Sequence, residues 1–283
     1  MKALLLILLV LSLMVSPSFG QTLDIISFNI RYDNPNDGEN AWPNRKSELV
    51  ELINYYHPDF VGSQEGLDHQ IKYVNNHLQD YTSIGVGRED GRTQGEFAAI
   101  FYDSTKYQLV RQNTFWLSEK PNKVSIGWDA ALERICTYGL FKEKSTENLV
   151  YVFNVHFDHV GVVARKMSAK LILEKIDELT DENSTVVLMG DLNCHPNSAP
   201  IVQLRSALSD GMEISKNSFY GPNGTFNAFD SSHELTERID YIFTQNLHVL
   251  SYRHIDDRRK DKGFISDHLP VLLKAKMNST NTN

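Results

Sequence analysis

Apolar and polar positions along the chain follow two spacings, one typical of helices and one typical of strands. Leu49, Leu52 and Ile53 recur at helical spacing and Pro58 lies beyond them, so a helix is expected over 46–56. Similar patterns predict helices over 66–78, 162–179 and 201–208. Apolar and alternating runs predict strands at 23–30, 59–63, 81–86, 97–102, 108–117, 134–141, 149–155, 185–189, 238–243, 249–253 and 270–274.

The order of these elements indicates an α/β protein in which extended runs dominate. No internal repeat, Pro/Gly/Ser-rich linker or charge block divides the chain, so a single domain is expected. Strands over 81–141 follow one another through turns, which suggests antiparallel pairing. Two mixed β-sheets, packed face to face and covered by helices on the outside, would accommodate this order.

The N-terminus has the pattern of a signal peptide over residues 1–20. Lys2 precedes an apolar run over 3–15, and small residues follow at the cleavage-site spacing. This run is shorter than the roughly 20 residues that a membrane-spanning helix needs. We therefore expect cleavage before Gln21, a catalytic domain over 21–283 without a transmembrane segment, and a secreted or periplasmic location; an uncleaved anchor is the alternative.

Charge and cysteine content restrict the kind of partner. The formal net charge is -8, and removal of Lys2 makes it one unit more negative. A broad basic surface for non-specific binding to a polyanion is therefore excluded, and an anionic substrate must be held locally. Cys136 and Cys194 are too few for a disulfide scaffold. We interpret both as buried or site-adjacent thiols, with pairing as the alternative, and expect a monomer.

Polar side chains capable of chemistry stand where the predicted strands end. Burying such groups is costly unless they are paired or bind a cation, so their repeated position at the ends of apolar runs indicates one shared site. Taken singly, an Asp or Asn after a strand is usually a turn former. The residues concerned are Asn29, Glu65, His156, Asp191, Asn193, Asp240, Asp267 and His268.

Six short segments carry a family resemblance, and they occur in the family's order. They are Ser27-Phe28-Asn29-Ile30-Arg31, Gln64-Glu65, Asn154-Val155-His156, Gly190-Asp191-Leu192-Asn193, Arg238-Ile239-Asp240-Tyr241 and Ser266-Asp267-His268-Leu269-Pro270. Over about residues 23 to 275 the chain resembles the endonuclease/exonuclease/phosphatase superfamily. The resemblance implies a DNase I-like four-layer α/β sandwich, a catalytic Mg²⁺ or Mn²⁺, and hydrolysis of a phosphate ester by a phosphodiesterase, phosphatase or nuclease.

The resemblance also implies which residues hold the metal. Glu65 would bind the cation, helped by Asn29 and, through water, by Asp267. Oxygen ligands and retained waters suit Mg²⁺, which agrees with this choice of residue types. The cation would neutralise a phosphate oxygen during in-line attack by water.

The remaining family positions would act on the water and the phosphate. Asp191 would position and deprotonate the attacking water, and Asn193 would orient the water or the phosphate, because an amide cannot act as a base. His156 would donate a hydrogen bond to a non-bridging oxygen. His268, oriented and made more basic by Asp240, would do the same or serve as the base. The resemblance leaves open whether Asp191 or His268 takes the proton.

Further segments resemble a bacterial secreted branch of this superfamily and draw attention to Arg134. The guanidinium of Arg134 matches phosphate oxygens, so it is a candidate phosphate clamp; an ordinary ion-paired strand arginine is the alternative. Glu96 and Asp129 would help the site or simply orient Arg134. The segments are 87–91, 95–102, 115–118, 127–131 and 134–135.

The sequence says less about the substrate. Trp42, Trp116, Trp128 and Tyr220 are candidates for lining a cleft, although aromatic residues are more often part of a core. The loop over 209–237 is a candidate substrate lid because it lies between the Asp191 and Asp240 motifs. A basic, aromatic-interleaved insertion is absent from the sequence, which disfavours tracking along DNA. Small molecules, lipid headgroups and nucleic acid remain open as phosphorylated substrates.

Two alternatives to this metal-dependent hydrolase deserve a test. A zinc site built from His156, Asp158 and His159 is conceivable, but this compact spacing lacks the separated ligands of a hydrolytic zinc motif. A catalytically inactive module that binds a phosphorylated ligand on the same scaffold is the other alternative. The intact set of acidic and imidazole residues argues against it.

Overall fold

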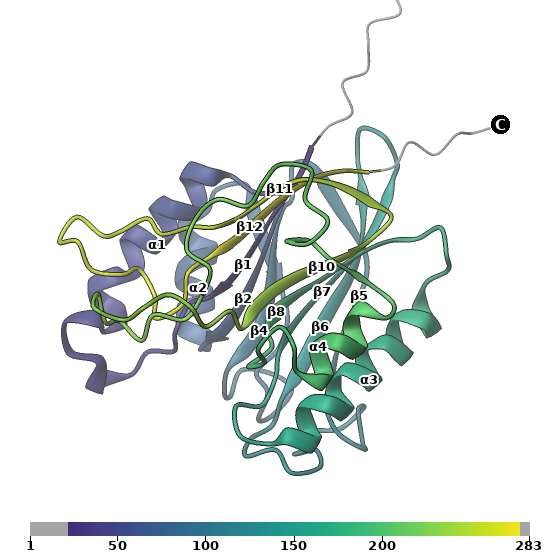
Figure 1. Cartoon of the computed structure of the whole chain (residues 1–283), viewed down its shortest axis with the longest axis horizontal. Helices are drawn as coiled ribbons and strands as arrows, with labels where there is room; N and C mark the ends of the chain where they lie inside the picture. Colours follow the sequence, from purple (N-terminus) through teal and green to yellow (C-terminus); the bar gives the residue numbers. More distant parts are fainter. Residues whose placement is uncertain (1–21, 278–283) are drawn as a thin grey trace, which may run out of the picture.

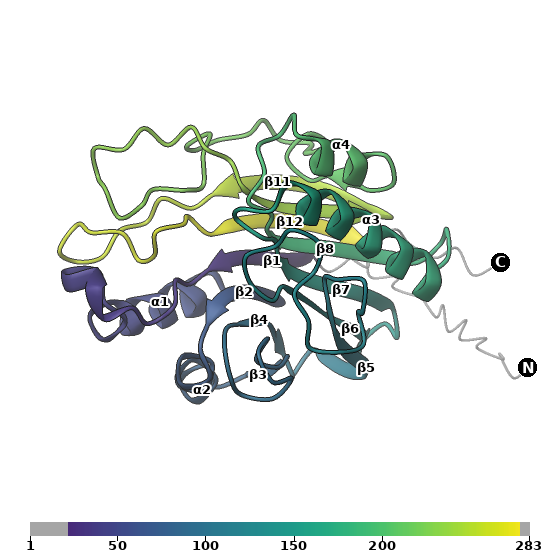
Figure 2. The ribbon, with the colours of Figure 1, turned by 90° about the horizontal axis from the view of Figure 1, so that it is seen from below.

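The computed structural model describes residues 22–277 and contains two β-sheets of six strands each (Figure 1). The sheets lie between helices, with α3 and α4 on one side and α1 and α2 on the other (Figure 2). This is the α/β sandwich expected from the order of the predicted elements. The predicted signal peptide over 1–20 lies outside the described residues.

Each sheet combines strands from distant parts of the chain. Sheet A has the order β11 (Leu247–His254), β12 (Val271–Met277), β1 (Thr22–Asn29), β2 (Phe60–Gly66), β4 (Phe97–Asp103), β3 (Tyr81–Ile84). Sheet B has the order β5 (Tyr107–Trp116), β6 (Ile135–Glu143), β7 (Leu149–His156), β8 (Thr185–Asp191), β10 (Asp240–Gln245), β9 (Ser209–Asp210). The helices are η1 (Pro35–Asn40), α1 (Trp42–Tyr56), α2 (Asp68–His77), α3 (Val162–Leu179) and α4 (Ala199–Arg205).

Both sheets are built around one parallel pair of strands. Strand β1 pairs in parallel with β2 through the crossover helix α1, and β7 pairs in parallel with β8 through α3. The other pairs are antiparallel, including β3 with β4 and β5 with β6, as predicted for the 81–141 region. Parallel strands end at the same edge of a sheet. The residues at the ends of each pair therefore lie together at one end of the sandwich.

Three apolar layers hold the sandwich together. The layer between the sheets includes Phe60, Ile100 and Phe141 from strands of both sheets. Helices α1 and α2 bury residues such as Leu49 on the outer face of sheet A, and α3 and α4 bury residues such as Ile172 on sheet B. Strands covered on both faces are continuously apolar, which explains why β8 appears in the sequence as an unbroken hydrophobic run.

A buried polar contact joins the two sheets next to the strand ends. Gln64 Nε2 on β2 donates a hydrogen bond to Asn154 Oδ1 on β7 over 2.6 Å. Asn154 Nδ2 in turn donates to the carbonyls of Ser63 and Ala99, each over 2.8 Å. Both amides are fully buried, so these bonds fix how the sheets meet where the polar residues gather.

The state of the two cysteines agrees with the expectation from the sequence. Cys136 and Cys194 are both free and buried, as predicted. Among residues 22–277, none of the helices is both long and apolar enough to cross a bilayer.

Candidate active site

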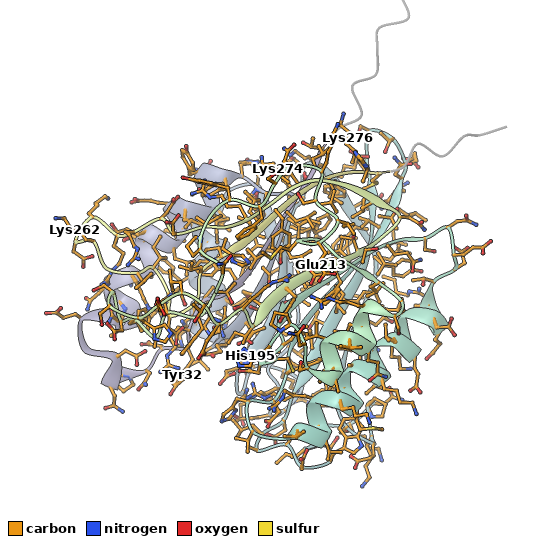
Figure 3. All side chains as sticks on the ribbon, in the orientation of Figure 1. Tyr32, His195, Glu213, Lys262, Lys274 and Lys276 are labelled. Atoms are coloured by element: carbon orange, nitrogen blue, oxygen red, sulfur yellow. The ribbon has the colours of Figure 1, made fainter. Side chains whose placement is uncertain are left out.

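A pocket of about 810 Å³ opens at the end of the sandwich where the two parallel strand pairs terminate. Figure 3 shows Tyr32 on the half of the molecule that contains sheet A and His195 on the half that contains sheet B, and both residues line this pocket. The polar residues of its wall are Arg31, Tyr32, Asp37, Glu65, Glu96, Arg134, His156, His159, Asp191, Asn193, His195, Glu237, Asp267 and His268. The apolar residues are Leu132, Phe226, Ala228, Phe229 and Ile239.

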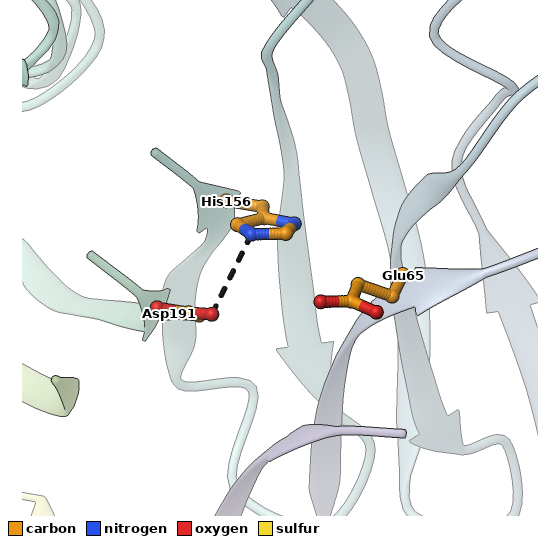
Figure 4. A group of neighbouring side chains, drawn as sticks. All are labelled: Glu65, His156 and Asp191. Carbon is orange, nitrogen blue, oxygen red and sulfur yellow. Dashed lines mark ion pairs between the residues drawn. The ribbon is translucent and has the colours of Figure 1, made fainter. Parts of the chain in front are cut away.

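The structure brings the predicted site residues together from both sheets. His156 and Asp191 end β7 and β8 and are paired in register, and Asp240 begins β10 directly opposite Asp191. Glu65 lies in β2 and faces His156 and Asp191 across the pocket (Figure 4). Residues 266–268 lead into β12 and bring His268 to the same place.

Strained backbone accompanies the functional side chains. Glu65 and Asn193 adopt left-handed conformations, with φ of 65° and 47°, that side chains other than glycine rarely take. Gly190, just before Asp191, has φ of 151°, and a Cβ there would collide with the carbonyl of Val155. Such strain persists where the surrounding structure enforces it, which is common at functional sites. Glycine is therefore required at 190 to bring β8 close enough to β7.

Carboxylates and one imidazole form a group with the donors that a divalent cation needs. Ligand atoms of Glu65, His156 and Asp191 all lie within 4.8 Å of one another. Asn29 Nδ2 donates to Glu65 Oε1 over 2.9 Å and to Asp191 Oδ2 over 3.0 Å, while its Oδ1 accepts from the backbone N–H of Arg31. Asn29 thus presents its amide nitrogen to the carboxylates, and its role as a metal ligand stays a prediction.

Burial of so many acidic groups disturbs their ionisation. Burial and the nearby Asp240 carboxylate raise the pKa of Asp191 to about 7. Burial, with Glu65 as a further cause, raises the pKa of Asp267 to about 6 and that of Glu96 to about 7. A divalent cation would relieve this repulsion, and oxygen donors suit Mg²⁺ and Mn²⁺. The donor set therefore fits such an ion.

His268 and Asp240 form a buried carboxylate–imidazole pair. Asp240 Oδ2 lies 2.8 Å from His268 Nδ1, and Nε2 of the same ring lies 3.8 Å from Asp191 Oδ2. Burial opposes the charged imidazolium, but Asp240 and Asp191 together hold the pKa of His268 well above its usual value. The prediction that Asp240 orients His268 and makes it more basic agrees with this geometry.

His156 has a carboxylate neighbour too, yet its ionisation is opposite. Glu96 Oε2 lies 3.7 Å from His156 Nδ1, but it also receives a 2.6 Å hydrogen bond from Arg88. Burial, followed by the charges of Arg134 and Arg88, lowers the pKa of His156 well below its usual value. The Nε2 of His156 lies 3.3 Å from Asn193 Nδ2 and 3.5 Å from Asp191 Oδ2, so a neutral ring faces the pocket centre.

Arg134 is buried at the edge of the pocket with one donor nitrogen free. Its Nε lies 3.3 Å from Asp158 Oδ2, its Nη2 lies 2.8 Å from His159 Nδ1, and its buried Nη1 has no hydrogen-bond partner. Burial would raise the pKa of Asp158, but backbone N–H bonds and Arg134 lower it to about 2. Asp158 and His159 therefore fix the orientation of the guanidinium, which brings positive charge to the wall of the pocket.

Of the two acidic residues expected to help the site or orient Arg134, Asp129 does neither and Glu96 belongs to the site. Asp129 does not orient Arg134; it accepts hydrogen bonds from the N–H groups of Val163 and Ala164 at the start of α3. Glu96 pairs with Arg88 instead of Arg134, although it does line the pocket.

The zinc alternative is contradicted as well. Asp158 and His159 are both bonded to Arg134, and the metal-capable groups among residues 22–277 do not combine them with His156. His159 instead lines the rim of the pocket.

The aromatic residues that line the pocket are not the expected ones. Trp42 and Trp116 are buried in the core, and neither Trp128 nor Tyr220 lines the pocket. Tyr32, Phe226 and Phe229 contribute rings instead. The last two belong to the 209–237 loop, which agrees with its predicted place over the site.

Arg31, Asp37 and His195 were not predicted. Arg31 is part of the first family segment, but its side chain carried no separate signal. Asp37 comes from η1, a short element that hydrophobic spacing cannot detect because none of its residues is buried. His195 lies beyond Asn193 in a loop whose path depends on the fold.

A DNase I-like α/β sandwich with a carboxylate and imidazole centre between its sheets defines a phosphoester hydrolase. The chain belongs to the Endonuclease/Exonuclease/phosphatase family, whose sequence profile matches residues 26–268. Enzymes of this family are typically dependent on divalent metals. The family and fold implied by the sequence motifs are therefore confirmed.

Proteins similar to this chain include members from a bacterium and a giant virus. A family member from Bacteroides thetaiotaomicron is 36% identical with a TM-score of 0.87, covering 92% of this chain and 99% of its own. A mannosyl-6-phosphatase from the same species is 38% identical with a TM-score of 0.86, covering 89% of this chain and 99% of its own. An uncharacterised protein of Acanthamoeba polyphaga mimivirus is 26% identical, covering 82% of this chain and 91% of its own.

Proposed function

We propose that this chain is a secreted, Mg²⁺- or Mn²⁺-dependent phosphatase that hydrolyses a phosphate monoester of a small polyhydroxylated molecule such as a sugar. The convergence of Glu65, His156, Asp191 and His268 in one pocket carries the hydrolase assignment. The inactive binding module has no observation in its favour, because this set of side chains is complete and its members face one another.

The substrate class rests on the pocket and on similarity. Arg134 lines the pocket, and the positive charge of its guanidinium would attract a terminal phosphate group. Carboxylates on the pocket wall, among them Asp37 and Glu237, are acceptors for hydroxyl groups, while the rings of Tyr32 and Phe229 offer apolar surface. The mannosyl-6-phosphatase that is 38% identical supports a sugar phosphate.

The side chains divide the work of hydrolysis according to their protonation. Glu65 would hold the divalent cation, which would supply positive charge to neutralise the phosphate. Arg134 and the neutral His156 orient the phosphate, and Asn193 orients the attacking water. Asp240 and Asp191 raise the pKa of His268 and so favour its protonated form, which would donate a hydrogen bond to the developing charge while Asp191 accepts the proton of the water. We therefore assign the role of base to Asp191 and that of charged donor to His268.

Replacement of Asp191 tests the proposal. Asp191→Asn keeps the shape but removes the base, so kcat on mannose 6-phosphate should fall at least about 10³-fold. The exposed Asp261→Asn is the matched control and should retain activity. Chelation should abolish turnover, and Mg²⁺ or Mn²⁺ should restore it. Unchanged turnover of Asp191→Asn would refute the mechanism, and a wild-type preference for bis-p-nitrophenyl phosphate or DNA would refute the monoester assignment.

Secretion rests on the N-terminal pattern alone. The full-length protein, expressed in a bacterial host, should reach the periplasm or medium with Gln21 as its first residue, as determined by N-terminal sequencing. A cytoplasmic product that retains Met1 would contradict it.

A further inference from the structure

Residues 224–228, which we call the bridging segment, lie between the chain that enters β10 and the chain that enters β12. On the β10 side, the N–H of Thr225 donates a hydrogen bond to the carbonyl of Glu237 over 2.8 Å. On the β12 side, the carbonyl of Thr225 accepts from the N–H of Leu269 over 2.6 Å. The bridging segment therefore connects the two parts of the chain that carry the buried carboxylate–imidazole pair.

The hydroxyl of Thr225 holds the backbone at the start of β10. Its Oγ1 accepts hydrogen bonds from the N–H groups of Ile239 over 3.1 Å and Asp240 over 3.2 Å. Because the N–H of Leu192 donates to the Ile239 carbonyl, Asp191 and Asp240 form a non-hydrogen-bonded pair of the ladder. The N–H of Asp240 thus points away from β8. Thr225 is fully buried, so this N–H depends on the hydroxyl as its acceptor.

The same segment holds the imidazole of the pair. Phe226 forms an isolated β-bridge with His268, and its ring lies 5.1 Å from the imidazole at an angle of 66°. The N–H of Asn227 donates to the carbonyl of Asp267 over 2.8 Å. One segment therefore fixes the backbone on both sides of the 2.8 Å contact between Asp240 Oδ2 and His268 Nδ1.

We propose that Thr225 is a positioning residue whose hydroxyl sets Asp240 against His268. Thr225 does not line the pocket, so its effect on turnover passes through the residues that it holds. Within the part of the chain that the structure describes, Asp240 Oδ1 is buried without a hydrogen-bond partner, so the direction of this carboxylate depends on its backbone and on the imidazole. This inference rests on the proposed hydrolase function and adds a residue outside the six family segments.

Turnover of mannose 6-phosphate by Thr225 variants tests the proposal. Thr225→Val keeps the branched shape but removes the acceptor, so kcat should be about tenfold lower than that of wild type, with KM within about twofold. Thr225→Ser keeps the hydroxyl and should keep the kcat of wild type. Thr244→Val is the matched control, because Thr244 is a buried residue of β10 whose hydroxyl has no hydrogen-bond partner among residues 22–277. Its kcat should be unchanged.

A double-variant cycle separates action through Asp240 from a general loss of packing. In Asp240→Asn the charged pair is already lost, so adding Thr225→Val should lower kcat by less than about twofold further. Hydrogen exchange in wild type, followed by nuclear magnetic resonance, tests the bond itself. The N–H of Asp240 should exchange slowly because it is buried and bonded to the hydroxyl.

The outcomes separate this inference from the proposed function. A wild-type kcat in Thr225→Val would overturn the inference, and so would an equal loss in Thr225→Ser or Thr244→Val. The same loss from Thr225→Val with and without the Asp240 carboxylate would overturn it too. Fast exchange of the Asp240 N–H would do so whether or not Thr225→Val folds, as checked by circular dichroism. No turnover of mannose 6-phosphate by wild type would instead refute the proposed function, and the exchange measurement would still test the hydroxyl.

Discussion

The two carboxylate–imidazole pairs of the active site look alike but behave differently. In each, the carboxylate belongs to one sheet and the imidazole to the other: Glu96 precedes β4 of sheet A and faces His156 of sheet B, while Asp240 of sheet B faces His268, which leads into sheet A. Yet the pKa of His156 is lowered and that of His268 is raised.

The difference comes from what else surrounds each ring. Asp240 is 2.8 Å from His268, and Asp191 adds a second negative charge. Glu96 is 3.7 Å from His156 and is itself bonded to Arg88, while Arg134 adds positive charge. A carboxylate beside a histidine therefore does not by itself predict a charged imidazole, because the balance of nearby charges decides. One ring can then act as a charged donor and the other as a neutral one.

Removal of the two imidazoles should give the largest difference between the pairs. His268→Ala removes the charged donor at the developing charge, so its kcat should be about 10³-fold lower than that of wild type. The kcat of His156→Ala should be about 10²-fold lower. Steady-state kinetics on mannose 6-phosphate give both values. Equal losses in two folded variants would show that the protonation difference has no catalytic consequence.

Neutralising the two carboxylates should give a smaller difference in kcat between the pairs than removing the two imidazoles. Asp240→Asn keeps the size of the side chain but cannot stabilise a charged His268, so kcat should fall about 10- to 100-fold. Glu96→Gln should lower kcat less than about tenfold, because Glu96 makes no hydrogen bond to His156 and the ring is already neutral. A larger loss of kcat in Glu96→Gln than in Asp240→Asn would contradict this difference between the two pairs.

The pH dependence of stability should show the smallest effect, with opposite signs for the two rings. His268 has a raised folded pKa, so its stabilisation is complete below the unfolded value near 6.5 and is lost as pH rises toward the folded value. His156 has a lowered folded pKa, so wild type loses stability as pH falls below about 6.5. Each slope is at most about 1.4 kcal/mol per pH unit.

Urea unfolding of metal-free protein between pH 5 and 9 measures these slopes. The stability difference between wild type and His268→Gln should shrink as pH rises above about 6.5. His156→Gln should gain stability relative to wild type as pH falls below about 6.5. Slopes of the same sign would contradict the opposite protonation of the rings.

Elements with strong hydrophobic spacing were predictable from the sequence, and the short ones were not. The prediction of α3 over 162–179 matches its bounds, because a long periodic segment carries its own signal. The predicted start of α1 at 46 was late, since Trp42 begins the helix. The two-residue β9 was missed, because its pairing depends on β10, far away in the sequence.

The sequence was enough to predict which residues form the candidate site, but not which of them form hydrogen bonds and ion pairs with one another. Ordered family segments pointed to Glu65, Asp191 and His268, because chemistry restricts those positions to particular side chains. The partners of Arg134 were misassigned, since Asp158 reaches it only through the folding of the loop beyond β7. Contacts of this kind depend on side-chain direction, which sequence spacing does not determine.

Because both histidine pairs cross between the sheets, neither sheet alone contains a working centre. A chain that has formed its strands but not yet docked them would give much of the far-ultraviolet circular dichroism of the native protein and hydrolyse nothing. Regain of turnover after dilution from denaturant would therefore time the docking of the two sheets, separately from the formation of the sheets themselves.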